Sequence, residues 1–442
     1  MSYFSEVEKI WKEYLAWLQV VKERKLRFTT RIKKLNNFLL QEKNLLEQSF
    51  YSACFPPEET DNLEEVRSLR PAGPRNLVEK LNQDQLEDKI LGAWLGRAAG
   101  CILGIPCEGM SKESIRFACL HLGLDYPLCS YWKKDPKPLS PETLHYETTP
   151  RKKYLQKHLS YIGADDDLAY TLLGLLILEE YGYQFTTEDV ARAWLKYLPF
   201  ACTAEAVALS NLKKGVSPYL AGSLDNPYVD WIGADIRSDP WAYAAPAAPE
   251  KAAEMAYRDA FLSHRGTGVH AAMFFSAAIS AAFVCQTPLK AIEIGLTEIP
   301  EKCRFSRTVL QTIDWCEKDR DWEKTTSRIL KFYQGMSGAH TLNNAALTVA
   351  GLFYGAGDFT RTISLTVMAG LDTDCTGATA GSLLGALLGA RNLPAAWKKP
   401  LGNNVETYLL GKRRFKSTEI ASRFTQVAHA VLHLKRKKVR GK

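Results

Sequence analysis

The chain has 442 residues, of which 46% are hydrophobic and 24% charged, and its formal net charge is +8 at pH 7. This is the composition of an ordinary globular protein with a large core, which excludes a disordered or fibrous chain. The ten cysteines show no Cys-x-x-Cys or zinc-finger spacing, so we expect free thiols in a reducing, cytoplasmic compartment. Charged residues interrupt the first apolar stretch, so no signal peptide is expected.

Residues 1–52 are predicted to form a helical hairpin. Apolar residues recur every three or four positions in two stripes, and basic residues lie between the stripes, as in 22–27. Such a hairpin needs a surface to bury its apolar face, which could be the protein body, a second copy or a protein partner. A basic amphipathic helix can also lie on acidic lipid or nucleic acid. Paired prolines and clustered acids then predict a linker or surface arm over 53–82.

A core domain is predicted from 83 to 411. It begins with a glycine-spaced apolar helix over 92–108 that ends at Glu108. Residues 123–160 are rich in proline, tyrosine and lysine, and we expect a loop that borders the site as a lid. The segment 161–170 then places three acids, Asp165 to Asp167, directly before an apolar helix. These acids could form a solvated helix cap or hold a cation.

The segment 218–249 mixes aromatic residues, glycines and arginine without a period, and it includes Trp231. Exposed aromatic rings beside an arginine suit a planar base and a diphosphate, but a well-packed structural loop is an equal alternative. Beyond it, helices are predicted over 250–262, 269–285, 288–297, 305–317, 321–334, 341–354 and 359–369. The apolar stretch 269–285 is short for a bilayer and contains a histidine, so no membrane span is predicted.

The stretch 370–386 carries Asp372 and Asp374 in a polar loop with glycine on both sides. Four glycines then repeat every four residues, which stacks them on one helix face and lets a neighbouring helix approach closely. Two carboxylates at the mouth of such a helix are unfavourable unless a cation binds them, and magnesium prefers oxygen ligands. Helix capping is the alternative. The second acidic helix start at 165–167 favours two facing helix ends that share cations.

Residues 412–442 are predicted to form a basic amphipathic tail. The tail ends in a run of lysines and arginines over 435–442. Such a run can bind nucleic acid or acidic lipid, but a terminal basic segment is more often solvated.

From about residue 86 to 411 the chain resembles the ADP-ribosylglycohydrolase family, through four segments in the family's order: 92–108, 161–170, 262–268 and 370–386. The resemblance implies an all-α, compact orthogonal multi-helix domain, here with an N-terminal helical appendage. It also implies a hydrolase that uses metal-activated water to cleave the glycosidic bond at ribose C1 of ADP-ribose linked to protein or nucleotide. It further implies two Mg²⁺ ions, with Mn²⁺ as the alternative, and an ADP-ribose bound across the cleft. The metal ligands would be Asp165, Asp166, Asp372 and Asp374, to which we add Cys375, and the catalytic residues would be Glu108 and Asp166. The substrate-binding residues would be Ser263, His264, Gly266 and Gly268, with Trp231 added from the aromatic segment.

The chain departs from the family pattern at four positions. Ala164 and Cys375 stand where the family usually has threonines, Cys101 replaces an acid, and Asp167 replaces the last threonine of the early motif. A thiol could shift metal preference toward manganese or zinc, or the site could hold one metal. Two further functions therefore stay open: a catalytically altered module that binds ADP-ribosylated partners, and a basic-tailed protein associated with nucleic acid.

Overall fold

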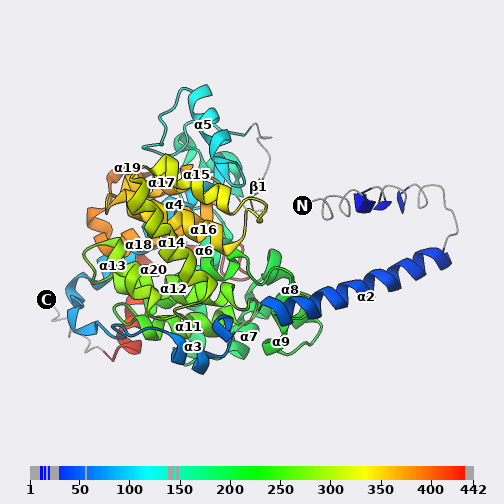
Figure 1. Ribbon diagram of the computed structural model, residues 1–442. Helices are drawn as coiled ribbons and strands as arrows, with labels where there is room; N and C mark the ends of the chain where they lie inside the picture. The colour runs from blue at the N-terminus through cyan, green and yellow to red at the C-terminus, as the bar shows by residue number, and fades with distance from the viewer. Residues whose placement is uncertain are drawn as a thin grey trace. The chain divides into compact units, whose positions relative to one another are not determined.

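The computed structural model describes residues 10–12, 14–15, 18–19, 29–54, 57–137, 144–145 and 149–433. The chain divides into two compact units, the first ending at residue 56 and the second beginning at residue 57. The first unit contains helix α2 (Thr29–Cys54; Figure 1). This helix carries exposed large hydrophobic side chains, among them Phe38 and Leu46. Most of the first predicted helix, including the basic run 22–27, lies outside the described residues.

Helices dominate the second unit. Its α-helices are α3 (Leu63–Leu69), α4 (Leu86–Gly104), α5 (Lys112–His121), α6 (Asp166–Tyr181), α7 (Thr187–Tyr197), α8 (Thr203–Lys213), α9 (Pro218–Ala221), α10 (Asp239–Ala244), α11 (Pro249–Ala260), α12 (Thr267–Ala282), α13 (Pro288–Leu296), α14 (Arg304–Asp319), α15 (Trp322–Phe332), α16 (Thr341–Gly355), α17 (Phe359–Met368), α18 (Thr373–Leu388), α19 (Ala395–Lys398) and α20 (Ser417–Val431). Short 3-10 helices connect them: η1 (Pro57–Glu59), η2 (Val78–Lys80), η3 (Gln83–Gln85), η4 (Ile105–Cys107), η5 (Arg151–Tyr154), η6 (Gln156–His158), η7 (Ile232–Arg237), η8 (Ala390–Asn392) and η9 (Lys399–Leu401).

The described strands form two small antiparallel pairs. Strand β1 (Leu144–His145) pairs with β2 (Thr149–Pro150), and β3 (Asn404–Glu406) pairs with β4 (Arg414–Lys416) with Val405 opposite Phe415. The all-α prediction is therefore confirmed. Each of the seven helices predicted beyond residue 250 is present, with ends that differ by a few residues, because their apolar periodicity and caps agree. The cap of α17 is an example, since the side chain of Asp358 accepts a hydrogen bond from the amide of Arg361.

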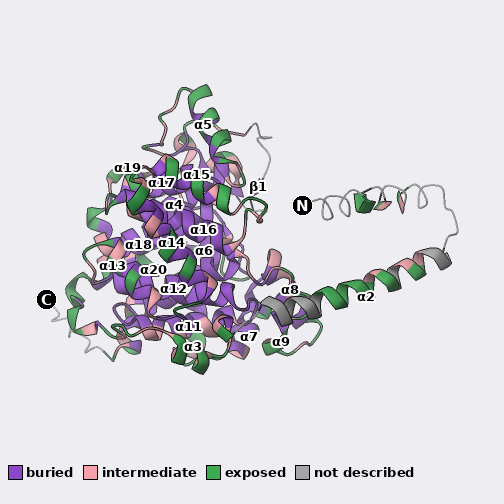
Figure 2. Ribbon diagram, viewed as in Figure 1, coloured by how far each residue is buried: buried purple, intermediate pink, exposed green. Residues whose placement is uncertain are grey.

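Helices α4 and α18 pack against each other through the glycines that the sequence spaces four apart. A Cβ at Gly100 would overlap the carbonyl of Gly377, one at Gly96 would overlap that of Gly381, and one at Gly92 would overlap that of Gly385. The two helices therefore touch backbone to backbone. Both lie in the buried interior of the unit together with α12 and α16 (Figures 1 and 2). This contact fixes the end of α4 beside the beginning of α18.

Within the described residues, the stretch Gln83–Cys107 is long and apolar enough to cross a membrane, but 94% of its apolar window is buried inside the unit. That burial identifies α4 as a core helix.

The predicted tail differs from what the structure shows. Helix α20 buries Ile420, Phe424 and Val431, and its first residue, Ser417, accepts a hydrogen bond from the indole of Trp94 on α4 at 3.0 Å. The apolar stripe of this segment thus completes the core, which extends past the predicted boundary at 411. The final basic run lies outside the described residues.

Candidate functional site

Two acidic helix starts form the centre of the candidate site. Asp165 caps α6 and accepts a hydrogen bond from the amide of Asp167 at 2.9 Å, while Asp372 occupies the cap position of α18. Asp165, Asp167 and Asp374 are buried, and Asp166 and Asp372 are partly exposed. An acid before an apolar run is a strong helix start, which explains where α6 and α18 begin. The glycine contact holds the start of α18 against α4, and Arg97 of α4 binds Asp167 in the first turn of α6.

Two groups of possible metal ligands lie in this cluster. Asp165, Asp166 and Asp167 each offer a carboxylate oxygen, and these oxygens lie within 4.8 Å of one another. Asp167, Asp374 and Cys375 form the second group within the same limit. Asp167 belongs to both groups.

Glu108 lies beside the second group. It follows η4 at the end of α4, and the next residues pair with the loop before α18: the amide of Gly109 donates to the carbonyl of Leu371 at 2.8 Å, and the amide of Leu371 donates to the carbonyl of Met110 at 3.2 Å. Burial and the nearby charge of Glu108 raise the pKa of Asp374 well above its usual value. The structure therefore places Glu108, partly exposed, at the edge of the acid cluster.

The electrostatics of the cluster favour a bound cation. Burial raises the pKa of Asp372, and it raises the pKa of Asp167 well above the usual range, although the charge of Arg97 opposes the shift at Asp167. In addition, Oδ1 of Asp374 is buried and has no hydrogen-bond partner among the described residues. A buried oxygen without a partner, among several carboxylates, is what a divalent cation would satisfy, so the residues fit the metal that the motifs imply.

Arg97 is a site residue that the sequence analysis missed. Its buried guanidinium donates to the carbonyl of Asp167 at 2.7 and 3.0 Å, to Oδ1 of Asp167 at 3.2 Å, to Oδ2 of Asp239 at 2.6 Å and to the carbonyl of Ile236 at 2.6 Å. It therefore ties α4, the first turn of α6 and η7 together under the acid cluster. The sequence did contain a signal for Arg97, because it is the one charged residue in the glycine-spaced apolar run 92–104.

The predicted substrate-binding residues gather in a second region. Ser263 Oγ accepts a hydrogen bond from Arg237 at 2.9 Å and lies 2.8 Å from Nδ1 of His264. Trp231 caps η7 and pairs with His340 at the start of α16. A Cβ at Gly268 would overlap the carbonyl of the nearby residue 229. The 3-10 helix η7 links this region to the acid cluster, because its carbonyl at Ile236 binds Arg97.

His264 is completely buried in this region, and Nε2 has no hydrogen-bond partner among the described residues. Burial and the charges of Arg237 and Arg265 lower its pKa well below the usual value, so its imidazole is neutral at physiological pH.

The beginning of α12 is covered by residues 57–81, which we call the arm. The carboxylate of Asp61 accepts a hydrogen bond from the amide of Gly266, and Glu59 accepts one from the hydroxyl of Thr267 at 3.4 Å. Glu59 also accepts a hydrogen bond from the amide of Arg304, at the start of α14. A carboxylate of the protein thus binds the amide of Gly266, one of the residues predicted to bind substrate.

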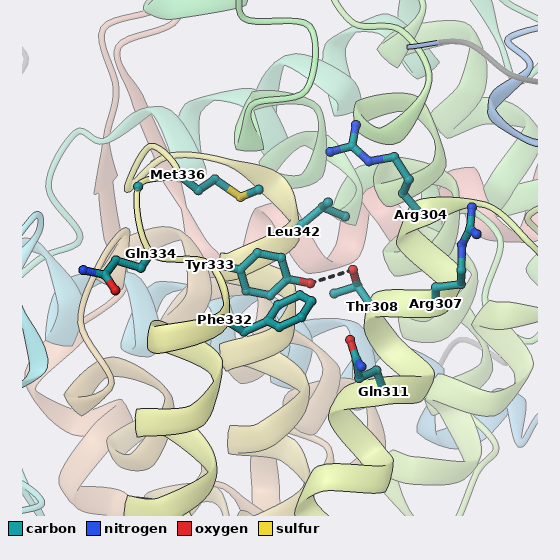
Figure 3. A pocket seen from close by; sticks show the side chains of 10 residues that line it. Arg304, Arg307, Thr308, Gln311, Phe332, Tyr333, Gln334, Met336 and Leu342 are labelled. Atoms are coloured by element: carbon teal, nitrogen blue, oxygen red, sulfur yellow. Dashed lines mark hydrogen bonds between the residues drawn. The ribbon is translucent and has the colours of Figure 1, made fainter. Parts of the chain in front are cut away.

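Figure 3 shows the side chains that line a cavity of about 610 Å³. Its walls come from the first turns of α14, from the turn after α15 and from the start of α16, and the residues are Arg304, Arg307, Thr308, Gln311, Phe332, Tyr333, Gln334, Gly335, Met336 and Leu342. Arg304 pairs with Asp230 at 3.3 Å, next to Trp231. The hydroxyls of Tyr333 and Thr308 are 2.8 Å apart. The cavity combines two cations with exposed ring surface.

Comparisons with known proteins give a family match and a similar fold. The family model of the ADP-ribosylglycohydrolases matches residues 82–434. No curated protein matches the chain. Among solved structures, a chain described as an ADP-ribosylglycohydrolase-related protein complex is similar at 18% sequence identity, with a TM-score of 0.52, over 79% of this chain and 99% of its own length. At that identity the similarity shows the fold.

Proposed function

Because the chain belongs to the ADP-ribosylglycohydrolase family, we propose that it hydrolyses the glycosidic bond at ribose C1 of ADP-ribose conjugated to protein or nucleotide. The observation that carries the proposal is the meeting of the α6 and α18 acid clusters, which includes the buried, unpartnered oxygen of Asp374. Hydrolysis at C1 passes through an oxocarbenium-like state, which requires a positioned water and held ribose hydroxyls.

The cluster offers ligands for divalent cations. Asp165, Asp166 and Asp167 offer an all-oxygen set, for which Mg²⁺ or Mn²⁺ is the proposed ion. Asp372 lies near Asp165, and Asp374 contributes on the side of Glu108. Such a cation, when bound, lowers the pKa of a coordinated water and orients the ribose. Two ions are proposed because the ligands fall into two groups.

The protein's own residues have separate tasks in this proposal. Glu108 and Asp166 are two of the partly exposed carboxylates at the cluster, and we assign them proton transfer at the scissile bond. Arg97 holds Asp167 in place by contacts to its carboxylate and its carbonyl. The ribose would lie over the acids, with the diphosphate extending past Trp231.

The nucleotide end is proposed to reach the cavity of Figure 3. Phe332 and Tyr333 offer ring surface for stacking. Arg307 is exposed, lies 3.7 Å from the carboxylate of Glu58, and would exchange that contact for a phosphate. The cavity borders the Trp231 segment, because the amide of Thr341 donates to the carbonyl of Asp230 at 3.1 Å.

The test measures free ADP-ribose released from arginine-, serine- and nucleotide-linked conjugates by the full chain with Mg²⁺ or Mn²⁺. Glu108→Gln is expected to lower kcat by about 10²–10⁴-fold, the usual contribution of a general acid–base group. Asp372→Asn is expected to abolish turnover. The matched control, Asp314→Asn, changes an exposed acid that pairs with Lys318 on α14, and it should leave the rate unchanged. Release of no ADP-ribose, or wild-type rates in both site variants, would overturn the proposal.

A second function is favoured by Ala164 and Cys375, which replace two hydroxyl groups of the family pattern. A protein that has lost catalysis would bind ADP-ribosylated partners without turning them over. Calorimetry that shows ADP-ribose binding without metal, together with no release in the assay above, would support this function over hydrolysis.

A further inference from the structure

One side of the acid cluster contains a sulfur atom. The thiol of Cys375 donates a hydrogen bond to Oδ2 of Asp167 at 3.1 Å, and the ligand atoms of Cys375, Asp167 and Asp374 all lie within 4.8 Å of one another. All three residues are buried. Three buried ligand atoms at this spacing can contact one ion, and one of the three is sulfur.

The unpartnered Oδ1 of Asp374 indicates independently that a ligand belongs here. Asp374 is only 4% exposed, and this oxygen has no hydrogen-bond partner among the described residues. A buried carboxylate oxygen is unfavourable without a donor or a cation.

The second group of acids has a different chemistry. Asp165, Asp166 and Asp167 offer only oxygen. Arg97 binds Oδ1 of Asp167 at 3.2 Å, while Oδ2 receives the hydrogen bond of Cys375. The oxygen that Arg97 leaves available therefore faces the sulfur.

Hard cations such as Mg²⁺ prefer oxygen ligands, whereas Zn²⁺ and Co²⁺ accept a mixture of thiolate and carboxylate. We propose that the two cation positions are not equivalent: the position formed by Asp167, Asp374 and Cys375 takes a thiophilic divalent metal through the Cys375 thiolate, and the all-oxygen position takes Mg²⁺ or Mn²⁺. When the metal binds, the Cys375 S–H bond breaks, the sulfur electron pair forms the S–metal bond, and the proton leaves to solvent. The inference rests on the proposed function in placing cations at this cluster.

The experiment uses the metal-free full chain and Co²⁺ alone as the probe. A thiolate ligand gives Co²⁺ a near-ultraviolet sulfur-to-metal charge-transfer band, which needs no substrate. The wild-type protein should develop this band with one equivalent of Co²⁺ and keep it in excess Mg²⁺. Cys375→Ser should lose the band, and its affinity for Co²⁺ by calorimetry should fall by about tenfold or more, as for loss of a well-placed metal contact.

Two cysteine variants are controls. Cys101→Ser removes the other thiol at the cluster, which hydrogen-bonds Asp165 but is not in either ligand group, and Cys202→Ser removes an exposed thiol. Both should keep the band. A wild-type protein without the band, or a band that survives in Cys375→Ser, overturns the inference. Hydrolysis in Mg²⁺ without the band would refute only this inference, whereas a band without hydrolysis of any conjugate would refute only the proposed function.

Discussion

Replacement of Arg97 by methionine should destabilise the protein strongly and in a pH-dependent way. The guanidinium is completely buried and forms ion pairs with Asp239 at 2.6 Å and with Asp167 at 3.2 Å. Removing one partner of a buried charge pair costs about 3–5 kcal/mol, because the other charge is left uncompensated. Methionine keeps much of the volume, so the loss reports on charge and hydrogen bonds more than on a cavity.

The pH dependence follows from the two carboxyls. Burial raises the pKa of both Asp167 and Asp239 in the folded protein, and Arg97 opposes both shifts. Without Arg97 both pKa values should rise further. A carboxyl that keeps its proton in the folded chain but ionises in the unfolded chain makes stability fall as pH rises above the unfolded pKa of about 4. The stability deficit of Arg97→Met should therefore be small at acidic pH and grow toward neutrality.

The assay is urea unfolding followed by tryptophan fluorescence at pH 5 and pH 8, with a chelator present so that metal binding does not contribute. Arg423→Met is the matched control, because Arg423 forms an ion pair of the same length, 2.6 Å, with the partly exposed Glu179. Partly exposed pairs contribute only about 0–1 kcal/mol. The reasoning would be refuted if Arg97→Met lowered the free energy of unfolding no more than the control does. It would also be refuted if the loss caused by Arg97→Met were the same at both pH values.

Three further outcomes are expected. Gly381→Ala should lower stability by about 1–3 kcal/mol or more in thermal unfolding, because its Cβ would overlap the α4 backbone, whereas Gly338→Ala, with open space around it, should change little. Arg307→Ala should raise KM for a nucleotide-linked conjugate with kcat nearly unchanged; an unchanged KM would remove the cavity from the substrate site. Burial lowers the pKa of His340 to about 4, so the stability of the protein should fall as pH drops from about 6.5 toward that value. His340→Asn should flatten this part of the curve of melting temperature against pH. Parallel curves for the wild type and the variant would contradict this expectation.

The positions of the helices and the acid clusters could be predicted because their signals are local. The acids at 165–167 and at 372 and 374 each precede an apolar run, and the four-residue glycine spacing predicts a close contact between helices. The structure shows that contact between α4 and α18, and the cluster at its end contains Asp167, which joins both ligand groups.

The partners of these residues could not be predicted in the same way. Arg97 contacts Asp239 across more than a hundred residues of chain, and neither helix period nor composition encodes such a pairing. The arm is a second example. Its clustered acids indicated a linker, but Asp61 and Glu59 bind backbone amides at the starts of α12 and α14, which lie some two hundred residues later in the sequence. Long-range electrostatic partners become visible only when the fold is known.

The arm lies outside the region that matches the family, yet it contacts that region closely. The region shared with the family begins at residue 82, but Arg70 and Arg75 both pair with the buried Glu298, at 2.6 and 3.0 Å. A polypeptide starting at residue 82 would leave that carboxylate without either guanidinium and would expose the amide of Gly266. We therefore expect a chain that begins at residue 82 to be less stable than one that keeps the arm.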